Sequence, residues 1–515
     1  MFIQVLFFIL SLVLTLLFFI YGFNHYYLLN AARHYQPPSL PELPFIRPEV
    51  SIHLPVYNER YVVRRLLAAC AVMAEAYGIE KVSILILDDS DDDTVQEVDK
   101  VVLEYLPKHF KMEILRRRIR TGFKAGALQA ALLGTREEFI AIFDADFIPP
   151  ADFLLRTLPY FVQDERVGIV QSRWTHLNRN YNFLTRAIAL GIDIHFLIEQ
   201  TGRFAVGCFQ NFNGSGGVLR KKAVLEAGGW SADTLAEDLD LSYRMQTREY
   251  KVVYLKDLHS PGELPPTVPS FMMQQGRWAN GSLRTARKIL PGFLPDHKFG
   301  FKQRLEASVH LTGFMIQPLM VFSFVLTCLT ALSGLSNPSA IHLISLVPAT
   351  GNLLMAGTIP INTLQNLIWV ILFPFIVLCT LAPWVSSLTT LKVQDLSPVK
   401  NLPTLLVLLF LGFGLSLSNT REAGKALLSN RIWEFIRTPK YADLQNKQDW
   451  RTRRYQSSMD PIWMAEVLFI LLGLLAIGFA IHYSNLSVLL ILVPFTLSYG
   501  FVLLFSILQS RNAKA

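Results

Sequence analysis

The stretch FIAIFDADF, at residues 139–147, carries the pattern that decides the fold of this chain. Its five leading apolar residues predict a buried strand, which ends at two carboxylates, Asp144 and Asp146. In an open α/β sheet, ligands bind in the crevice outside the carboxyl ends of the strands. Two hard oxygen ligands there suit Mg²⁺ or Mn²⁺, and such a metal suits a diphosphate. The alternative is a polar turn that only closes the strand, because Asp-x-Asp by itself is common.

Strands and helices alternate around this stretch. Further strands are predicted at 50–56, 82–87, 112–115 and 171–174. One predicted helix ends near Tyr77, a second follows the strand at 82–87 and continues through Asp99, and two more cover 124–133 and 181–200. Such alternation predicts a mostly parallel sheet with helices on both faces.

Polar pairs follow three of these strands. They are Asn58/Glu59, Asp88/Asp89 and Asp144/Asp146. Because the carboxyl ends of parallel strands share one edge of the sheet, three such pairs together predict a nucleotide site. The sequence has no Gly-x-Gly-x-x-Gly and no Gly-Lys-Ser/Thr loop, which argues against a dinucleotide or P-loop site.

Three more motifs follow in the second half of this region. The loop FNGSGG, at 212–217, consists mostly of small residues, so a ligand can approach its backbone closely. Two carboxylates at 237–238 stand where a helix is expected to start. Gln274, Arg277 and Trp278 fall on one face of a later helix, at positions i, i+3 and i+4.

The composition separates the middle of the chain from its ends. The 515 residues are 51% hydrophobic with a mean hydropathy of +0.34, too apolar for an ordinary soluble enzyme, while residues 45–290 have a globular composition. The net charge of +8 is typical of the Lys/Arg bias of cytoplasmic segments in a membrane protein, and we prefer this to nucleic-acid binding. The four cysteines lie far apart and indicate neither a disulfide framework nor a zinc site.

Apolar runs at both ends predict membrane spans. We expect retained transmembrane helices at 2–23, 309–332, 364–391, 462–482 and 486–508. The run 402–418 reaches only about 25 Å at 1.5 Å per residue, short of a 30 Å hydrocarbon core. Residues 421–454 carry nine Lys/Arg and should lie on the cytosolic side. Residues 45–290 should lie there too if they use a nucleotide. We therefore prefer five spans, with 402–418 in the interface and the N-terminus outside; seven spans, with 340–358 and 402–418 both crossing, are the alternative.

Together these motifs resemble the family 2 glycosyltransferases of the cellulose synthase superfamily, above all the cellulose synthase-like group that includes mannan, glucomannan and β-glucan synthases. The matching segments are Asp88–Ser90, Lys124–Leu128, Asp144–Phe147, Phe212–Gly214, Glu237/Asp238, Gln274-x-x-Arg277-Trp278 and Phe435–Lys440. They run in one colinear order from about 50 to 460. The resemblance implies a GT-A (Rossmann-like) α/β glycosyltransferase domain within an α-helical transmembrane frame.

The resemblance also implies a division of the chain into five parts. They are an N-terminal transmembrane helix at 1–36, a cytosolic GT-A catalytic domain at 45–290, an interface helix with transmembrane helices at 291–400, an interfacial helix with a gating-like loop at 401–460, and a C-terminal helix pair at 461–515.

The same resemblance implies a role for each motif. Asp238 is the expected general base, with Glu237 beside it. Asp144 and Asp146 are expected to bind Mg²⁺ or Mn²⁺. The donor nucleotide would meet Tyr57, Glu59, Asp88, Asp89, Lys124, Asp144, Gln274 and Arg277. The acceptor would meet Phe212, Asn213, Gly214 and Trp278, and a gating loop would include Phe435, Thr438 and Lys440.

Two positions depart from the family pattern. Ala236 stands where Thr often precedes Glu-Asp, so that side-chain contact is absent. Phe147 stands where cellulose synthases often have His, so a further protein ligand of the metal is not identified. For His195 and Glu199, a place near the acceptor and a purely structural role are both open.

The resulting hypothesis is an integral protein of the cell (inner) membrane that polymerises a β-1,4-linked hexose from UDP-glucose or GDP-mannose and passes the chain through its own helices. Its partners would be the sugar donor, the growing polysaccharide and the bilayer. One alternative is a non-processive enzyme that glycosylates a membrane lipid. Another is a structural or transport protein with an inactive transferase domain, against which the intact set of Asp144, Asp146 and Asp238 argues.

Overall fold

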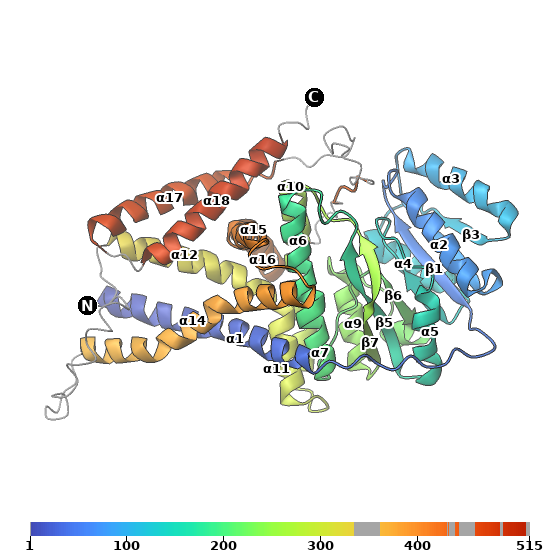
Figure 1. The fold of residues 1–515 in the computed structure, drawn as a ribbon, viewed down its shortest axis with the longest axis horizontal. Coiled ribbons are helices and arrows are strands. Elements are labelled where there is room, and N and C mark those ends of the chain that lie inside the picture. Colours follow the sequence, from blue (N-terminus) through green and yellow to red (C-terminus); the bar gives the residue numbers. More distant parts are fainter. Residues whose placement is uncertain are drawn as a thin grey trace. The chain divides into compact units, whose positions relative to one another are not determined.

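The computed structural model describes residues 2–333, 361–429, 431, 438–441, 459–484 and 488–510. The chain divides into two compact units, which we call the helical unit and the sheet unit. The helical unit comprises Met1–Tyr27, Gly313–Ala423 and Ser458–Ala515, and the sheet unit comprises Leu28–Thr312 and Gly424–Ser457. The elements of both are labelled in Figure 1.

The sheet unit is built on one seven-stranded sheet with the order β3-β2-β1-β4-β6-β5-β7. Its strands are β1 (Val50–Val56), β2 (Val82–Asp88), β3 (Lys111–Leu115), β4 (Phe139–Ile142), β5 (Val167–His176), β6 (Gly217–Arg220) and β7 (Lys251–Gly262). All neighbouring strands are parallel except at β6, which is antiparallel to both β4 and β5. The expectation of a mostly parallel α/β sheet is therefore confirmed, with one reversed strand that the sequence pattern does not reveal.

Helices flank the sheet, and several of them match the predicted ranges (Figure 1). They are α2 (Val63–Tyr77), α3 (Thr94–Tyr105), α4 (Phe123–Gly134), α5 (Phe153–Gln163), α6 (Phe183–Ile194), the π-helix η3 (His195–Gln200), α7 (Thr201–Ala205), α8 (Lys221–Glu226), α9 (Glu237–Thr247), α10 (Val268–Phe293) and α11 (Phe301–Leu311). Three short 3₁₀ turns lie at Ile79–Lys81, Leu106–Lys108 and Gly313–Met315.

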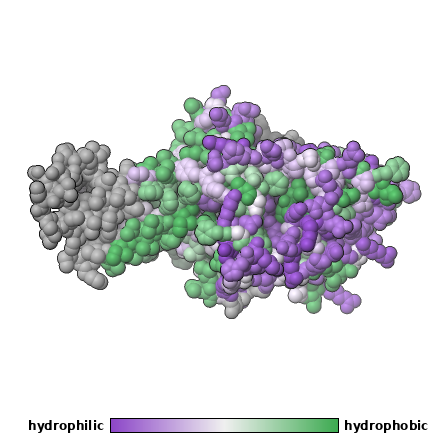
Figure 2. All heavy atoms as spheres, turned by 90° about the horizontal axis from the view of Figure 1, so that it is seen from below, coloured by the Kyte–Doolittle hydropathy of each residue, from purple (hydrophilic) through white to green (hydrophobic). Residues whose placement is uncertain are grey.

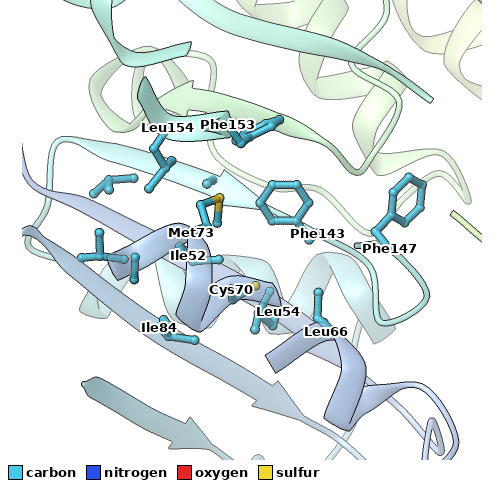
Figure 3. Packing of buried hydrophobic residues seen from close by; sticks show 14 of the residues in the cluster. Ile52, Leu54, Leu66, Cys70, Met73, Ile84, Phe143, Phe147, Phe153 and Leu154 are labelled. Atoms are coloured by element: carbon cyan, nitrogen blue, oxygen red, sulfur yellow. The ribbon is translucent and has the colours of Figure 1, made fainter. Parts of the chain in front are cut away.

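Strand β4 shows why the opening stretch is apolar throughout. Phe139 and Ala141 belong to the core shared with α2, α3 and α5, whereas Ile140 and Ile142 belong to the core shared with α4, α8 and α9. Alternate side chains point to opposite faces, and both faces are covered, so every position must be apolar. Phe143 continues the first core, where its ring packs edge-on against Phe153 at 4.9 Å (Figure 3).

The strand directions bring the motif-bearing loops to one edge of the sheet. Strands β1, β2 and β4 run parallel, so the residues after Val56, Asp88 and Ile142 emerge together. Because β6 is antiparallel to β4 and pairs Gly217 with Ile142, the loop before β6 arrives at that same edge. The ends of β5 and β7 meet there too, since His176 pairs with Gly262. This edge is where the sequence predicts a ligand site.

The helical unit is formed by helices, most of them long and apolar. They are α1 (Phe2–Arg33, whose last turn belongs to the sheet unit), α12 (Ile316–Leu332), α14 (Ile361–Val393), α15 (Leu402–Gly414), α16 (Ser416–Leu428, whose end belongs to the sheet unit), α17 (Trp463–His482) and α18 (Leu489–Ser510). Aromatic side chains pack between α12, α17 and α18, with Phe324 stacked on Phe469 at 5.7 Å and on Phe495 at 5.6 Å. On the face drawn in Figure 2, hydrophobic residues form one larger area, and further ones lie scattered among hydrophilic residues.

Four helices in the described part of the chain are long and apolar enough to cross a membrane. They are Ile9–Arg33, Gly313–Leu332, Trp463–His482 and Leu489–Ser510. The pair Leu402–Gly414 and Ser416–Leu428 is bent by 42°, as in a broken span or a re-entrant loop. The predicted span at 364–391 falls within α14. The part Val377–Val393 of this helix is apolar but shorter than the four candidate spans. Residues 340–358, which would cross in the seven-span alternative, lie outside the described residues.

Candidate active site

A cavity opens at the polar edge of the sheet and lies wholly within the sheet unit. Its lining includes most of the residues that the sequence singles out: Tyr57, Glu59, Asp89, Lys124, Asp144, Asp146, Asn213, Glu237, Asp238, Gln274, Arg277, Trp278, Thr438 and Lys440. Residues nearly 400 positions apart in the chain thus share one site.

Three predicted residues that the structure describes do not line this cavity. Asp88 has its carboxylate turned away, where it forms an ion pair with Arg116 at 2.9 Å and accepts a hydrogen bond from the backbone N–H of Ser90 at 3.1 Å. Phe212 is fully buried in the core beneath the loop. Gly214 lies behind the lining, against Asp238. Phe435 lies outside the described residues.

Two arginines that the sequence analysis does not single out hold residues at the end of the cavity where the nucleotide is expected. The guanidinium of Arg120 lies 3.3 Å from the ring centroid of Tyr57, a stacked cation–π geometry. Arg117 holds the carboxylate of Asp89, donating from Nε at 3.0 Å. Both arginines belong to the basic run RRRIR at 116–120, directly after β3, and that run was the available signal.

Lys124 is the central cation of the site. Its ammonium lies 2.6 Å from a carboxylate oxygen of Asp144 and 3.6 Å from one of Glu237, and it donates to the carbonyl oxygen of Gly214 at 3.1 Å. Burial alone would lower the pKa of Lys124, but the carboxylates of Asp144, Glu237 and Asp238 outweigh it and raise the pKa above its ordinary value. Lys124 therefore stays positively charged and ties three motifs together.

Asp238 lies in the first turn of α9 and is half-buried in the cavity wall. One of its oxygens accepts a hydrogen bond from the backbone N–H of Leu239 at 2.8 Å. Burial and the neighbouring carboxylate of Glu237 raise the pKa of Asp238 to about 7, against the opposing charge of Lys124. A carboxylate with a pKa near neutrality is suited to take a proton from a hydroxyl group.

Asp146 meets a segment from far along the chain. Its carboxylate accepts from Lys440 at 2.7 Å and from the backbone N–H of Glu263 at 3.1 Å. The Lys440 ammonium also donates to the carbonyl oxygen of Glu263 at 2.8 Å, and a carboxylate oxygen of Glu263 accepts from the backbone N–H of Tyr441 at 3.1 Å. Arg65 completes the cluster, with contacts to Glu263 at 3.3 Å and to the carbonyl oxygen of Asp146 at 3.2 Å. The sequence analysis does not single out Glu263 or Arg65, because no motif surrounds either residue.

Helix α10 presents Gln274, Arg277 and Trp278 to the cavity from one face, as their spacing predicts. Thr267 caps the start of this helix by accepting a hydrogen bond from Ser270. The Arg277 guanidinium donates to the hydroxyl of Thr438 at 2.7 Å, so α10 also meets the segment that carries Lys440.

The residues present fit a divalent metal held jointly with a diphosphate. Asp144 is 31% exposed in the cavity and Asp146 lies two positions further on. The described residues contain no group of three His, Cys, Asp or Glu side chains that could hold a metal by themselves. Phe147 packs into the core against Trp174 at 5.1 Å (Figure 3 shows its ring), so it adds no ligand. Mg²⁺ in particular commonly takes one or two protein carboxylates and completes its shell with phosphate oxygens and water.

Most of the chain matches models of known protein families. A family model described as "Glycosyl transferase family group 2" matches residues 139–416, and one described as "Glycosyl transferase family 2" matches residues 51–226. The chain is 33% identical over 326 residues to "Glucomannan 4-beta-mannosyltransferase 1" of Oryza sativa subsp. japonica, covering 58% of this chain and 62% of that protein. It is 35% identical over 263 residues to "Glucomannan 4-beta-mannosyltransferase 2" of Arabidopsis thaliana, covering 50% of this chain and 49% of that protein. The match thus spans less than two thirds of the length of these relatives.

One solved structure has a similar fold over much of the chain. It is the mannosyltransferase PcManGT of Pyrobaculum calidifontis in complex with GDP-Man and Mn²⁺. The likeness has a TM-score of 0.51 at 19% sequence identity and covers 73% of this chain and 98% of that one. At this identity the likeness concerns the fold alone.

Proposed function

Because the chain belongs to the family 2 glycosyltransferases and its sheet unit has the GT-A fold, we propose that it transfers mannose from GDP-mannose to the end of a growing β-1,4-linked mannan or glucomannan. UDP-glucose would be a second donor. The single observation that carries this proposal is the shared cavity of Asp238, Asp144, Asp146 and Trp278. The names of the curated relatives support the choice of mannose.

The proposed chemistry is one inverting displacement. Asp238 takes the proton of the acceptor hydroxyl as its oxygen attacks the anomeric carbon of the donor. The new carbon–oxygen bond forms while the bond to the diphosphate oxygen breaks, and the nucleoside diphosphate leaves with that electron pair. An α-linked donor then yields a β link. Glu237 supports this role because its charge helps to keep the pKa of Asp238 near neutrality.

The leaving diphosphate requires positive charge around it. A bound Mg²⁺ or Mn²⁺, held by Asp144 and Asp146, would offset the charge that develops on the diphosphate. Lys124 supplies a fixed positive charge beside Asp144, and Arg277 reaches the same cavity from α10. Guanidinium groups bind phosphate oxygens in a bidentate manner, which suits Arg277 to the diphosphate.

The two ends of the cavity would hold the two substrates. Tyr57, Glu59 and Asp89 surround the nucleotide end, and Gln274 lies on the donor side. Asp88 would act only indirectly there, since Arg116 holds its carboxylate. At the other end, Trp278 would stack on the terminal acceptor sugar, and the loop of Phe212, Asn213 and Gly214 would shape its pocket. A segment that includes Phe435, Thr438 and Lys440 would close over the bound nucleotide, in keeping with the contacts of Thr438 and Lys440.

The membrane part of the proposal keeps the five-part division of the chain. Residues 45–290 would form the cytosolic catalytic domain, and residues 1–36, 291–400, 401–460 and 461–515 its membrane frame. The N-terminus would lie outside the cell (inner) membrane, and the helices would pass the growing polymer across it. The candidate spans support membrane insertion.

The experiment that tests this function uses purified protein in detergent. The protein is incubated with radiolabelled GDP-mannose or UDP-glucose, with Mg²⁺ or Mn²⁺ and with a short β-1,4-mannan primer. We expect a long product from GDP-mannose that a β-mannanase digests. A chloroform-soluble product with a single sugar would instead establish the lipid acceptor, and the absence of transfer from either donor would refute the proposal.

A further inference from the structure

His195 is held between two polar partners beside the cavity. Its Nδ1 lies 3.2 Å from a carboxylate oxygen of Glu199, and its Nε2 lies 3.2 Å from the side-chain oxygen of Asn213. It is the first residue of the π-helix His195–Gln200. Such wide turns occur often at functional sites, because they shift side chains away from ordinary helical positions.

The hydrogen bonds of the Asn213 side chain determine which of its atoms faces Nε2 of His195. Asn211 donates to the side-chain oxygen of Asn213 at 2.9 Å, and the side-chain amide of Asn213 donates to the carbonyl oxygen of Asn211 at 3.3 Å. This pair of bonds fixes which end of the Asn213 amide faces His195. His195 therefore meets an acceptor oxygen at both ring nitrogens, and its Nε2–H can donate to the side-chain oxygen of Asn213.

A buried ion pair anchors this arrangement on the side away from the cavity. Glu199 also contacts Arg203 at 3.3 Å, and Arg203 forms an ion pair with Glu306 of α11 at 2.8 Å. The side chains of Arg203 and Glu306 are only 3% and 2% exposed. Side-chain contacts therefore run without a break from His195 through Glu199 and Arg203 to Glu306, and they hold the imidazole in place.

On the cavity side, hydrogen bonds to surrounding side chains hold the loop of residues 211–216. Gln200, from the same π-helix, donates to the carbonyl oxygen of Asn211 at 2.9 Å. Gln171 accepts from the backbone N–H of Asn213 at 3.1 Å, and Trp174 donates to the carbonyl oxygen of Ser215 at 2.9 Å.

The same loop reaches the candidate base. At Gly214, an added Cβ would lie 2.5 Å from a carboxylate oxygen of Asp238, so the loop backbone forms the wall beside it. A shift of Asn213 would therefore move the surface next to the base.

We propose that His195 is a positioning residue for the acceptor. It fixes the orientation of the Asn213 side-chain amide. One hydrogen of that NH₂ group bonds the carbonyl oxygen of Asn211, and the other points into the cavity. This second N–H can donate to a hydroxyl of the terminal acceptor sugar. This inference rests on the proposed function, because it needs a carbohydrate acceptor in the cavity. It assigns His195 no contact with the reacting atoms.

The test measures acceptor binding separately from turnover. Isothermal titration calorimetry compares the binding of β-1,4-mannohexaose by the full chain in detergent, with saturating GDP, before and after His195→Ala. We expect the Kd for mannohexaose to rise about tenfold, which corresponds to the loss of roughly one buried hydrogen bond, while GDP binding stays within about twofold. His195→Gln keeps one hydrogen-bond donor, so its Kd for mannohexaose should lie between those of the wild type and His195→Ala.

Two further variants separate positioning from general destabilisation. His53 is a buried histidine of β1 whose Nε2 lies 2.8 Å from the hydroxyl of Thr135, and in the described structure no hydrogen bond joins its side chain to the loop at 211–216. His53→Ala should lower Tm and leave the Kd for mannohexaose unchanged. In the double variant, His195→Ala should add little to Asn213→Ala, because both remove the same contact.

Each outcome decides between the two proposals. Additive losses in the double variant, or equal binding by wild type and His195→Ala, would overturn the positioning role and leave the proposed function intact. If the wild-type chain does not bind mannohexaose at all, the carbohydrate acceptor is wrong and the positioning role fails with it.

Discussion

Among single residues, Asp238 carries the largest expected effect. Asp238→Asn keeps the size of the side chain and one acceptor oxygen for the backbone N–H of Leu239 but removes the base, so kcat should fall by about 10²- to 10⁴-fold or more. Circular dichroism and GDP binding should be unchanged. Asp257→Asn, at an exposed position on β7, is the matched control and should be fully active. Substantial turnover by Asp238→Asn would contradict the base assignment.

The pH dependence of activity follows from the same carboxylate. Because burial and Glu237 raise the pKa of Asp238 to about 7, the base is ionised only above that pH, and kcat/KM should rise with pH through about 7. The effect on stability has the opposite sign. Between the ordinary pKa of aspartate, near 4, and pH 7, the folded protein holds a proton that the unfolded chain has lost, so this group makes the free energy of unfolding fall as pH rises.

The charge of Lys124 should tune this pH profile. Lys124 lowers the pKa of Asp238, so Lys124→Met should move the rising limb of kcat/KM to higher pH. Lys440→Met removes a lysine that pairs with Asp146 instead, and it should leave the position of the limb unchanged. Equal shifts in both variants would mean that the limb does not report on Asp238. A pH titration of initial rates checks this directly.

Gly214 tests how closely the loop approaches the base. Its φ of +79° is strained for any other residue, and an added Cβ would also press on Asp238. Gly207 has a similar φ of +66°, but nothing lies within 4 Å of its added Cβ. Both alanine variants should lose about 1–2 kcal/mol of stability from the left-handed backbone. Only Gly214→Ala should also lower kcat, by at least about tenfold, and equal activity of the two variants would contradict the close approach.

Among the elements, the end of β7 holds the segment at 438–441. Glu263→Gln keeps the size of the side chain but removes its charge, which weakens the contacts with Arg65 and with the backbone N–H of Tyr441. Trypsin should then cut after Lys440 several times faster, as followed by mass spectrometry of the peptide that ends there. The control is Glu138→Gln, at the position just before β4, which removes an ion pair with Arg220. It should not change the rate of cleavage after Lys440.

The order of strands explains why separate elements form one site. Strands β1, β4, β6 and β5 lie side by side although they are far apart in the sequence, and only β6 is reversed. That reversal delivers the loop before β6, rather than a loop after it, to the ligand edge. The loop before β6 and the pair Asp144 and Asp146 therefore come from opposite ends of neighbouring strands.

At the scale of the whole molecule, the open question is how the chain crosses the membrane. Helix α15 has 13 residues, so it rises only about 20 Å, and it is bent by 42° against α16. With five spans, the exposed Lys400 lies on the same side as the catalytic domain; with seven spans, it lies on the opposite side. We expect five spans.

Lys400→Cys distinguishes these two topologies. In sealed vesicles of known orientation, a membrane-impermeant maleimide should label the new cysteine only from the side of the catalytic domain. The parent chain without this substitution measures the background from the four native cysteines, three of which are buried. Labelling only from the opposite side would establish the seven-span topology.

Much of the fold is predictable from local pattern. Strand β1 lies at the predicted residues, and β2 and α4 differ by about one residue at their ends, because each has a continuous apolar or periodic signal. Strand β6 and helix α5 were not predicted. The four residues of β6 carry no period of their own, and α5 contains Pro159, which weakens its helical pattern.

The candidate site was predictable to a similar extent. The motif residues from Tyr57 to Trp278 converge on one cavity, except those that packing or pairing draws away, such as Asp88 beside Arg116. Glu263 and Arg65 could not be found in this way, because a single charged residue outside a motif gives no sign of its partner. Their importance appears only when distant segments are brought together.

The sequence by itself determined the chemistry that is available to this protein: carboxylates at the ends of apolar strands, a Gln-x-x-Arg-Trp helix face, and apolar helices at both ends of the chain. These follow from side-chain type and local period, which act over a few residues. The tertiary structure alone decided which of these groups share a cavity, which are neutralised by a partner, and where Lys124, Lys440 and His195 make their contacts. The physical reason is that ion pairs and hydrogen bonds depend on distances of about 3 Å, and only the packing of the sheet sets those distances.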